Sequence, residues 1–357
     1  MKENHGWKND MKEMYIGEDN TILDAMQLLD KTAKKVLFVQ EKEVLLASLT
    51  DGDIRRWILK KGDLQAEVKQ AANYRPQYLF EGQQDLAMSV MNKHGIDAIP
   101  IVDSKHVIKD VIFSNTVGIG RCQPTFDKEL PVVMMAGGLG TRLSPYTNIL
   151  PKPLIPIGDY TIAEHIINRF YMYGCRQFYM IVNYKRNMIK AYFDELEKNY
   201  SLEFIVEEKP LGTGGGISLL KGQISETFIL TNCDILIDDD LTKAYQRHSE
   251  SGNLITMICS LRNFTLPYGI VNIGQDGAIE SLTEKPQMSF FTNTGCYFVE
   301  PEVVNSIEDN EPIDFPTIIE KYIGERKRVG VYPIGEGAWL DMGQLDELDK
   351  MKKRLGY

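Results

Sequence analysis

The sequence predicts an α/β protein with a doubly wound, mostly parallel sheet and a small antiparallel lobe, preceded by a repeated N-terminal region. From Leu130 onward, short apolar runs alternate with helical patterns, which is typical of parallel strands joined by helices. The first of these runs ends in a glycine-rich loop, at the edge where such sheets bind ligands. Residues 15–115 show the order helix, strand, strand twice, which indicates tandem units that share a core.

Matching hydrophobic patterns define the N-terminal region. In its first half Ile22, Ala25, Met26 and Leu29 mark one face of a helix, and two apolar runs follow. In its second half a short helix at Ala87–Met88 again precedes two apolar runs. These runs predict strands at Val36–Val39, Val44–Leu49, Ala98–Val102 and Val107–Phe113.

Gly118–Lys128 separates this region from the rest of the chain. The segment has no hydrophobic periodicity and contains Pro124 and two glycines, a composition typical of linkers. We therefore predict a tandem regulatory region at residues 1–120, a linker at 121–129 and a catalytic domain at 130–357.

The larger domain begins with the apolar run Leu130–Met135, which suits a strand buried on both faces of a parallel sheet. Helices at Thr161–Tyr173 and Asn187–Leu196 are expected to alternate with strands at Phe178–Val182, Phe204–Val206 and Phe228–Leu230. Beyond Ser251 the pattern changes to strands separated by turns, which predicts the antiparallel lobe, and a polar helix is expected to reach Arg354. The strands of the lobe are expected at Leu254–Cys259, Gly269–Ile273, Ala278–Leu282 and Gly295–Val299.

Composition limits the possible partners and location. The 357 residues are 43% hydrophobic and 25% charged, which is ordinary for a globular protein. A net charge of -10, without a block rich in lysine and arginine, argues against a nucleic-acid partner. The five scattered cysteines form no Cys-x-x-Cys pair, so neither a disulfide framework nor a zinc site is predicted. The N-terminus lacks the apolar core of a signal peptide and no apolar run is long enough to span a bilayer, so we expect a cytoplasmic protein without a membrane partner.

A phosphate-binding loop is predicted after the first strand of the larger domain. Gly137, Gly138 and Gly140 allow a tight turn and a close approach of the backbone to an anion, because glycine has no Cβ. Arg142 adds a guanidinium that binds two phosphate oxygens together, and Lys152 stands between two prolines that stiffen the chain. An ordinary turn is the alternative. There is no Gly-Lys-Ser/Thr, which argues against a P-loop. The third glycine of a dinucleotide-binding loop is Leu143 here, which argues against a dehydrogenase.

An aspartate is predicted at the same edge of the sheet. Asp234 follows the strand Phe228–Leu230, and the carboxyl ends of parallel strands share one edge. A capping or turn aspartate is the alternative explanation. Further along, the motifs Glu284-Lys285-Pro286, Asn293-Thr294-Gly295 and Trp339-Leu340-Asp341 would each be assigned to a turn or a solvated charge if they stood alone.

The order of these motifs resembles that of the sugar-1-phosphate nucleotidylyltransferases, also called nucleoside-diphosphate-sugar pyrophosphorylases. The resemblance covers Leu130 to about Leu348 and depends on Gly-Gly-x-Gly-Thr-Arg-Leu-x-Pro followed by Pro-Lys-Pro-Leu. It implies catalytic phosphate contacts from Arg142 and Lys152, and a Mg²⁺ site at Asp234 and Asp341. It implies nucleotide contacts from Ala136, Gly137, Gly138, Gly140, Thr141, Asn183, Leu211, Gly212 and Thr213. It implies sugar and sugar-phosphate contacts from Gly269, Glu284, Lys285, Asn293 and Thr294.

The activity implied by this resemblance is transfer of a nucleotidyl group from a nucleoside triphosphate to a sugar 1-phosphate. Both reactants are polyanions, so the site must align them and neutralise charge rather than supply a nucleophile. The run Ile181–Lys185 and the N-terminal region are most similar to guanylyltransferases that act on glucosamine 1-phosphate in the legionaminic acid route, or on mannose 1-phosphate. This likeness favours GTP and a role in cell-surface glycan or nonulosonic acid biosynthesis. Dependence on UTP or dTTP, and a sensor that binds sugar nucleotides without turnover, are open alternatives.

The N-terminal region resembles a pair of CBS domains. In that family each copy ends on a strand followed by Thr or Ser and, three residues later, by an Asp that binds an adenine nucleotide. Thr50 and Asp53 match this pattern, whereas the second copy has Ser114 and then Val117 in place of the acid. The resemblance implies a regulatory nucleotide site at Thr50 and Asp53 and a homo-oligomer. Thr-x-x-Asp is also a common helix N-terminus, which is the alternative explanation.

Overall fold

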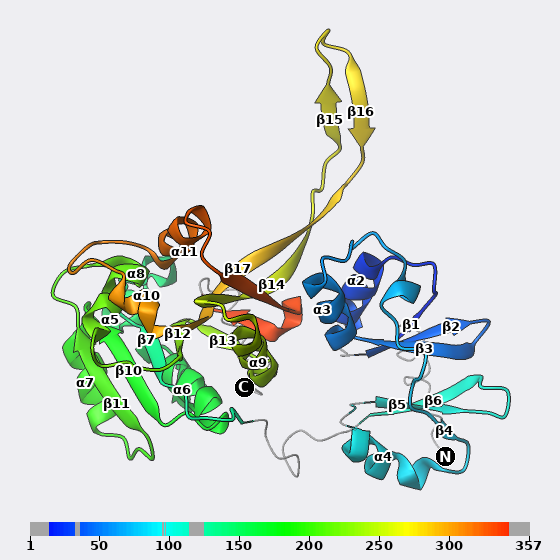
Figure 1. The fold of residues 1–357 in the computed structure, drawn as a ribbon, viewed down its shortest axis with the longest axis horizontal. Coiled ribbons are helices and arrows are strands. Elements are labelled where there is room, and N and C mark those ends of the chain that lie inside the picture. Colours follow the sequence, from blue (N-terminus) through cyan, green and yellow to red (C-terminus); the bar gives the residue numbers. More distant parts are fainter. Residues whose placement is uncertain (1–13, 33–35, 95, 97, 114–124, 343–357) are drawn as a thin grey trace. The chain divides into compact units, whose positions relative to one another are not determined.

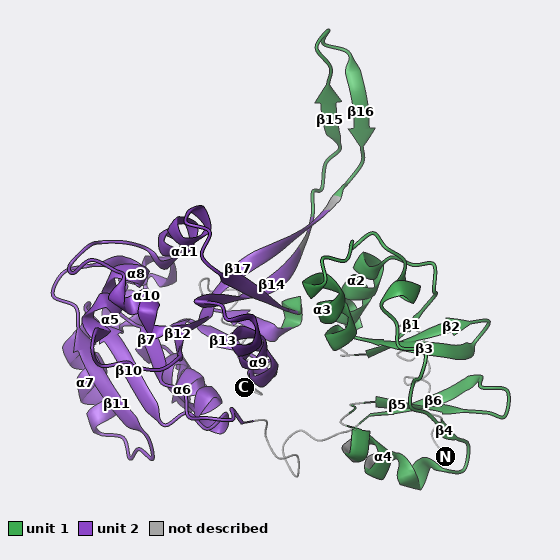
Figure 2. Ribbon diagram, viewed as in Figure 1, with its two compact units in different colours: residues 1–122, 265–287, 335–337 green, residues 123–264, 288–334, 338–357 purple. Residues whose placement is uncertain are grey.

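The computed structural model describes residues 14–32, 36–94, 96, 98–113 and 125–342. The chain forms two compact units (Figure 2). The first comprises residues 1–122, 265–287 and 335–337, and the second comprises residues 123–264, 288–334 and 338–357. Part of the predicted linker, the Ser114 to Val117 segment and the expected helix up to Arg354 lie outside the described residues. Within the described ranges, every helix is too short or too polar to cross a membrane.

Two three-stranded sheets with the same topology form the N-terminal region (Figure 1). In each sheet the first strand is parallel to the second, and the second is antiparallel to the third. The strands are β1 (Tyr15–Ile16), β2 (Val36–Glu41) and β3 (Val44–Thr50) in one sheet, and β4 (Leu79–Phe80), β5 (Ala98–Val102) and β6 (Ile108–Phe113) in the other. The helices are α2 (Ile22–Thr32), α3 (Asp51–Leu59) and α4 (Ala87–His94), with 3₁₀ turns η1 (Val68–Gln70) and η2 (Gln84–Leu86).

The two N-terminal sheets are joined by hydrogen bonds and by a common core. The Leu45 N–H donates to the His106 carbonyl at 2.9 Å, and the Ile108 N–H donates to the Glu43 carbonyl at 3.1 Å. Apolar side chains from both sheets pack in one buried cluster, which makes the two halves a single hydrophobic unit. The cluster contains Met14, Val36, Phe38, Leu45, Ala98, Val102 and Val111.

A seven-stranded mixed sheet forms the centre of the second unit, with the strand order β11-β10-β7-β12-β17-β14-β18. The first four strands in this order are parallel to one another, β17 is antiparallel to β12, and β14 is parallel to β18. The strands are β7 (Val132–Met135), β10 (Gln177–Val182), β11 (Ser201–Val206), β12 (Phe228–Asn232), β14 (Ile255–Thr265), β17 (Gln287–Val299) and β18 (Val329–Ile334).

Helices cover both faces of this sheet, which confirms the predicted doubly wound arrangement. Val132 and Met134 of β7 lie in one buried cluster and Val133 lies in another, because successive strand residues point to opposite faces. The first cluster includes α6 (Ile162–Met172), α7 (Arg186–Asp194) and α9 (Leu241–Ser251), and the second includes α10 (Pro301–Asn305) and α11 (Phe315–Gly324).

The expected separate antiparallel lobe is only partly correct. Two of its four predicted strands are parts of β14 and β17, which belong to the central sheet. The pairs Phe228↔Val299 and Thr231↔Cys296 place the end of β17 beside β12, where the fully apolar run Cys296–Val299 is buried. The remaining two strands, β15 (Ile270–Ile273) and β16 (Ile279–Thr283), form a two-stranded hairpin. The error arose because an apolar run does not reveal which strand it pairs with.

Several short elements lie between the main strands and helices. The strands β13 (Ile235–Ile237) and β19 (Trp339–Asp341) pair in antiparallel fashion, as do β8 (Pro156–Ile157) and β9 (Tyr160–Thr161). Helical turns are η3 (Thr141–Leu143), α5 (Tyr146–Ile149), η4 (Lys152–Leu154), α8 (Gly212–Gly215), η5 (Gly216–Leu220) and η6 (Glu336–Ala338).

Candidate active site

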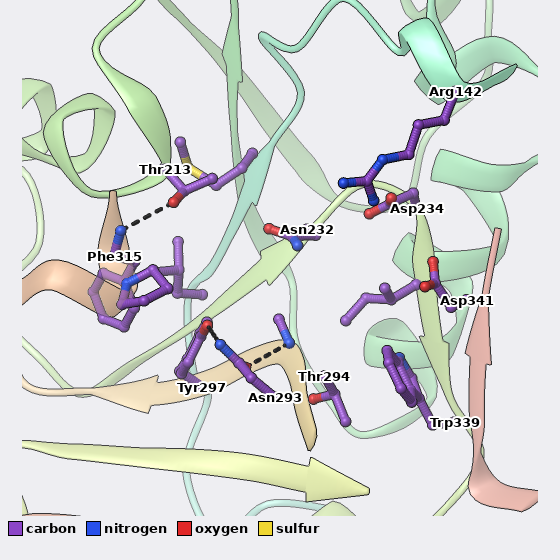
Figure 3. A pocket seen from close by; sticks show the side chains of 15 residues that line it. Arg142, Thr213, Asn232, Asp234, Asn293, Thr294, Tyr297, Phe315, Trp339 and Asp341 are labelled. Atoms are coloured by element: carbon purple, nitrogen blue, oxygen red, sulfur yellow. Dashed lines mark hydrogen bonds between the residues drawn. The ribbon is translucent and has the colours of Figure 1, made fainter. Parts of the chain in front are cut away.

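A pocket of about 250 Å³ lies at the carboxyl edge of the central sheet in the second unit (Figure 3). The strand order reverses at β7, because β10 lies on one side of it and β12 on the other. Ligands of open α/β sheets bind where the order reverses, outside the carboxyl ends of the strands. Six of the residues that line the pocket were predicted from the sequence: Arg142, Thr213, Asp234, Asn293, Thr294 and Asp341.

The segment that follows β7 is folded back on itself by Thr147. Gly140 has a left-handed conformation with φ of 66°, which favours glycine. The Thr147 hydroxyl donates to the Gly140 carbonyl at 2.9 Å, and a Cβ at Gly140 would lie 2.8 Å from Thr147 Cγ2 and 3.3 Å from Lys152 Cβ. Any side chain at position 140 would therefore push apart the part of the loop that carries Arg142 and the part that carries Lys152.

Lys152 and Asp234 form an ion pair across the pocket edge. The Lys152 ammonium donates to Asp234 Oδ2, and the two side chains are only 18% and 16% exposed. Figure 3 shows the Arg142 guanidinium extending toward the same carboxylate. A lysine that is paired with a carboxylate at the edge of a pocket can exchange it for an oxygen of an incoming phosphate.

Pairing of β13 with β19 brings the two predicted metal ligands to one pocket. Ile235 is opposite Asp341 in this ladder, and the Met342 N–H donates to the Asp234 carbonyl at 2.9 Å. Both aspartates line the pocket. Among the described residues, His, Cys, Asp and Glu form no group of three or more that could hold a metal. Two carboxylates suit Mg²⁺, because that ion takes one or two carboxylates together with substrate phosphates and water.

Glu207 links the two glycine-rich loops, and it was not identified from the sequence. Its Oε1 accepts from the Leu211 N–H at 2.9 Å, and its Oε2 would lie 2.8 Å from a Cβ at Gly137. Asn183 donates to the Glu207 carbonyl at 2.6 Å. Burial raises the pKa of the Glu207 carboxyl. Gly137 therefore leaves room for the Glu207 carboxylate, a role that no sequence pattern indicates.

The second glycine-rich loop packs against the segment that precedes α11. The Gly214 and Gly215 N–H groups both donate to the Ile313 carbonyl at 2.9 Å, so these amides are already used. A Cβ at Gly215 would lie 2.2 Å from the Glu311 carbonyl oxygen. The Thr213 hydroxyl accepts from the Phe315 N–H at 3.0 Å. These glycines allow two backbone segments to touch, and this contact holds Thr213 and Phe315 at the pocket.

Asn293 and Thr294 of β17 line the pocket, but their polar groups are largely engaged within the protein. Asn293 donates to the Tyr297 hydroxyl at 2.6 Å and accepts from the Gly295 N–H at 2.9 Å. The Thr294 hydroxyl donates to the Ile258 carbonyl at 2.8 Å. Burial raises the pKa of Tyr297 to about 12, so this phenol stays protonated at neutral pH.

Three predicted sugar contacts, Gly269, Glu284 and Lys285, belong to the first compact unit. Gly269 and Glu284 are neighbours at the base of the β15–β16 hairpin, where a Cβ at Gly269 would lie 2.8 Å from Glu284 Oε2. Lys285 follows with a left-handed φ of 44°. The part that these residues play in sugar binding stays a prediction.

Thr50 and Asp53 form a complete capping box at the start of α3. The Asp53 N–H donates to Thr50 Oγ1 at 3.1 Å, and the Thr50 N–H donates to Asp53 Oδ2 at 2.9 Å. Arg56 also pairs with the Asp53 carboxylate at 2.5 Å. The structure thus contains the alternative that the sequence allowed, and nucleotide binding at this pair stays a prediction.

Sequence reasoning missed several side chains that line the pocket. Asn232, Tyr297, Phe315 and Trp339 all contribute to its wall. Asn232 accounts for the glycine at position 295, because a Cβ there would lie 2.4 Å from Asn232 Nδ2. Asn232 and Trp339 each lie two residues before a predicted metal ligand. This spacing is the only feature of the sequence that indicated a place at the pocket for them.

Comparisons with known proteins agree with the motifs and the fold. Residues 131–356 match the family described as Nucleotidyl transferase. The chain is 33% identical over 223 residues to the mannose-1-phosphate guanylyltransferase catalytic subunit beta of Drosophila pseudoobscura pseudoobscura, covering 59% of this chain and 58% of that protein. It is 30% identical over 223 residues to the bifunctional protein GlmU of Methanococcus maripaludis (strain C5 / ATCC BAA-1333), covering 60% and 51%. The chain thus spans about half the length of the curated relatives it matches.

A solved structure shares the fold at lower identity. The crystal structure of HddC from Yersinia pseudotuberculosis complexed with GMP-PN has a TM-score of 0.51 and 22% identity, and covers 63% of this chain and 99% of that chain. The predicted resemblance to sugar-1-phosphate nucleotidylyltransferases is confirmed by the family match and the named relatives. Because the match covers residues 131–356, which is more than half of the sequence, this chain belongs to the nucleotidyl transferase family.

Proposed function

We propose that this protein is a sugar-1-phosphate guanylyltransferase that transfers GMP from GTP to glucosamine 1-phosphate or mannose 1-phosphate. The observation that carries the proposal is the Lys152–Asp234 ion pair at a pocket also lined by Arg142 and Asp341. The preference for GTP is supported by relatives at 33% and 32% identity that are named mannose-1-phosphate guanylyltransferase or guanyltransferase. The products are a GDP-sugar and pyrophosphate, for cell-surface glycan or nonulosonic acid biosynthesis.

In the proposed reaction a phosphate oxygen of the sugar 1-phosphate forms a bond to the α-phosphorus of GTP. The bond from that phosphorus to the oxygen that bridges to the β-phosphate breaks, and pyrophosphate leaves on the opposite side. Arg142 binds two phosphate oxygens at once, and Lys152 exchanges Asp234 for a phosphate oxygen. The main contribution of these residues is alignment and charge neutralisation.

Asp234 and Asp341 would hold Mg²⁺ in the proposed enzyme. Bound there, the ion supplies positive charge to phosphate oxygens during the displacement. Asp234 has a second role, because it neutralises Lys152 before substrates bind. The residues assigned to the nucleotide are Ala136, Gly137, Gly138, Gly140, Thr141, Asn183, Leu211, Gly212 and Thr213. Those assigned to the sugar phosphate are Gly269, Glu284, Lys285, Asn293 and Thr294.

The test is a matrix of five nucleoside triphosphates against several sugar 1-phosphates, scored by pyrophosphate release with Mg²⁺ present. The proposal predicts the highest rate with GTP and with glucosamine 1-phosphate or mannose 1-phosphate. A preference for UTP or dTTP would refute the base and keep the reaction class. Binding of sugar nucleotides without any pyrophosphate release would identify a sensor and overturn the enzyme.

We further propose that the N-terminal region is a CBS pair that regulates the enzyme and supports a homo-oligomer. The shared topology of its two sheets and the placement of Thr50 and Asp53 at the start of α3 support this proposal. All residues assigned to phosphate or metal follow Leu130, so the region takes no part in the chemistry. A bound adenine nucleotide shifts activity only as far as it prefers one arrangement of the chain, about 1–3 kcal/mol in typical cases.

A further inference from the structure

Three consecutive residues after β10 tie together the loops at the carboxyl edge of the sheet. Asn183 donates to the Glu207 carbonyl at the end of β11, at 2.6 Å. The Tyr184 N–H donates to the Gly137 carbonyl at 3.5 Å. Lys185 reaches the end of α5, in the segment between Gly140 and Lys152. This turn therefore contacts each of the neighbouring loops that carry predicted site residues.

The Lys185 ammonium makes three hydrogen bonds to successive carbonyl oxygens. Its Nζ donates to Thr147 at 3.2 Å, to Asn148 at 2.6 Å and to Ile149 at 2.8 Å. An ammonium has three N–H donors and no acceptor, so one side chain is fully used by the end of one short helix. The carbonyl end of a helix also carries partial negative charge, which favours a cation there.

The backbone of Lys185 is held in a conformation that lysine rarely adopts. Its φ is 51° and its ψ is 31°, in the left-handed region that favours glycine. Such a conformation costs about 1–3 kcal/mol and persists when the surroundings require it. The backbone conformation alone would favour glycine at this position. The presence of lysine is therefore explained by the hydrogen bonds of its side chain.

We propose that Lys185 is a positioning residue, which clamps the end of α5 and thereby fixes the segment that carries Arg142 and Lys152. The Thr147 hydroxyl ties α5 to Gly140 at the start of this segment, and Lys185 ties the last residues of α5 to the turn after β10. Without the clamp, Lys152 loses the fixed approach to Asp234. The inference rests on the proposed nucleotidyl transfer, because Arg142 and Lys152 act in that reaction.

Lys198 provides a matched control within the same unit. Its ammonium also donates to carbonyl oxygens at a helix end, that of Phe193 in the last turn of α7 and that of Leu196 just beyond it. It lies beside Ser201, the first residue of β11, at the edge of the sheet opposite the pocket. If Lys185 only stabilised a helix end, replacing it should affect exchange and activity no more than replacing Lys198 does.

The variants are Lys185→Gly, which relieves the backbone strain while removing the side chain, Lys185→Arg, and Lys198→Gly. Hydrogen exchange of residues 143–152 is measured without substrates, beside kcat, KM and thermal stability. We expect Lys185→Gly to exchange faster in this segment, to lose about 10- to 100-fold in kcat/KM, and to regain activity with propylammonium. Lys185→Arg should retain more activity than Lys185→Gly. Lys198→Gly should leave exchange in this segment and kcat/KM unchanged.

Normal kcat/KM in Lys185→Gly would overturn the proposal. Lost activity with unchanged exchange in residues 143–152 would also overturn it, because Lys185 would then touch the substrate directly. If the unmodified protein releases no pyrophosphate with any triphosphate, the proposed function fails. The exchange experiment contains no substrate. It therefore tests whether Lys185 restrains residues 143–152 even if the protein has no transferase activity.

Discussion

Asp234 has two partners in this account, the Lys152 ammonium and a bound Mg²⁺. Asp234→Asn removes the charge that both require, and Asp341→Asn removes the second carboxylate of the pocket. We predict that each variant loses at least about 100-fold in kcat at saturating Mg²⁺, because charge neutralisation of the phosphates is the main catalytic effect. Circular dichroism should show folded protein in both cases. A wild-type rate in either variant would remove the metal assignment.

Arg142 differs from a lysine in geometry rather than in charge. Its guanidinium offers two parallel donors to phosphate, whereas an ammonium offers a single point of contact. We predict that Arg142→Lys lowers kcat/KM by about 10-fold or more, a cost on the scale of the hydrogen bond to a charged group that it loses. The control is Arg176→Lys, at the opposite edge of the sheet, where the guanidinium stacks 3.7 Å from the Tyr171 ring centroid. Equal activity in the two variants would mean that Arg142 has a structural role.

Single residues also show where the sequence was insufficient. The phosphate-loop glycines were identified because their spacing is compact and local. Glu207 was not identified, since its role depends on Gly137, which lies 70 positions earlier and meets it only in the folded sheet. Thr50 and Asp53 show the opposite case, because a short pattern was compatible with both a helix cap and a ligand site, and the cap is what the structure contains.

Among the elements, α9 is joined to Glu300, the residue after β17, by a partly buried network at the edge of the sheet away from the pocket. His248 is 1% exposed and hydrogen bonds Glu300 at 2.9 Å, and Thr227 donates to the same carboxylate at 2.7 Å. The hydrogen bond from His248 is the largest of the effects that lower the pKa of Glu300. A carboxyl with a lowered pKa in the folded state stabilises the protein above its unfolded pKa and loses that contribution as the pH falls through its folded pKa.

We therefore predict that the free energy of unfolding falls as the pH drops below about 4.5, and that Glu300→Gln flattens this dependence. Urea titrations between pH 3 and 7 measure the effect. Glu320→Gln, on the exposed side of α11, is the control and should keep the wild-type slope. Identical slopes in the two variants would exclude a contribution of the Glu300 network. Activity at neutral pH should persist in Glu300→Gln, because the network is remote from the pocket.

The elements differ in how well the sequence predicted them. The alternating strands and helices up to β12 were placed correctly, because each has its own hydrophobic period and end signals. The strands β14 and β17 were located but assigned to the wrong sheet. The pairing of β14 with β18 and of β17 with β12 is set by contacts between distant parts of the chain. The sequence of an apolar run does not indicate which strand it will pair with.

For the whole molecule, we propose that the N-terminal region regulates the enzyme and that the transferase domain alone carries out the chemistry. A shortened chain tests this directly. We predict that a chain starting at Pro124 is folded and retains turnover within about 10-fold of the full-length protein, because all assigned chemistry follows Leu130. Adenine nucleotides should change the activity of the full-length protein and have no effect on the shortened chain. A shortened chain that is folded but inactive at every concentration would show that the N-terminal region contributes to the active site.

In the proposed reaction a phosphate oxygen of the sugar 1-phosphate attacks the α-phosphorus of GTP. The most direct measurement uses a sugar 1-phosphate whose phosphate oxygens are labelled with ¹⁸O, followed by mass spectrometry of both products. We predict that all of the label stays in the GDP-sugar, including its bridging oxygen, and that pyrophosphate is unlabelled. Label in pyrophosphate or in free phosphate, or release of pyrophosphate without a labelled GDP-sugar, would contradict the proposed reaction.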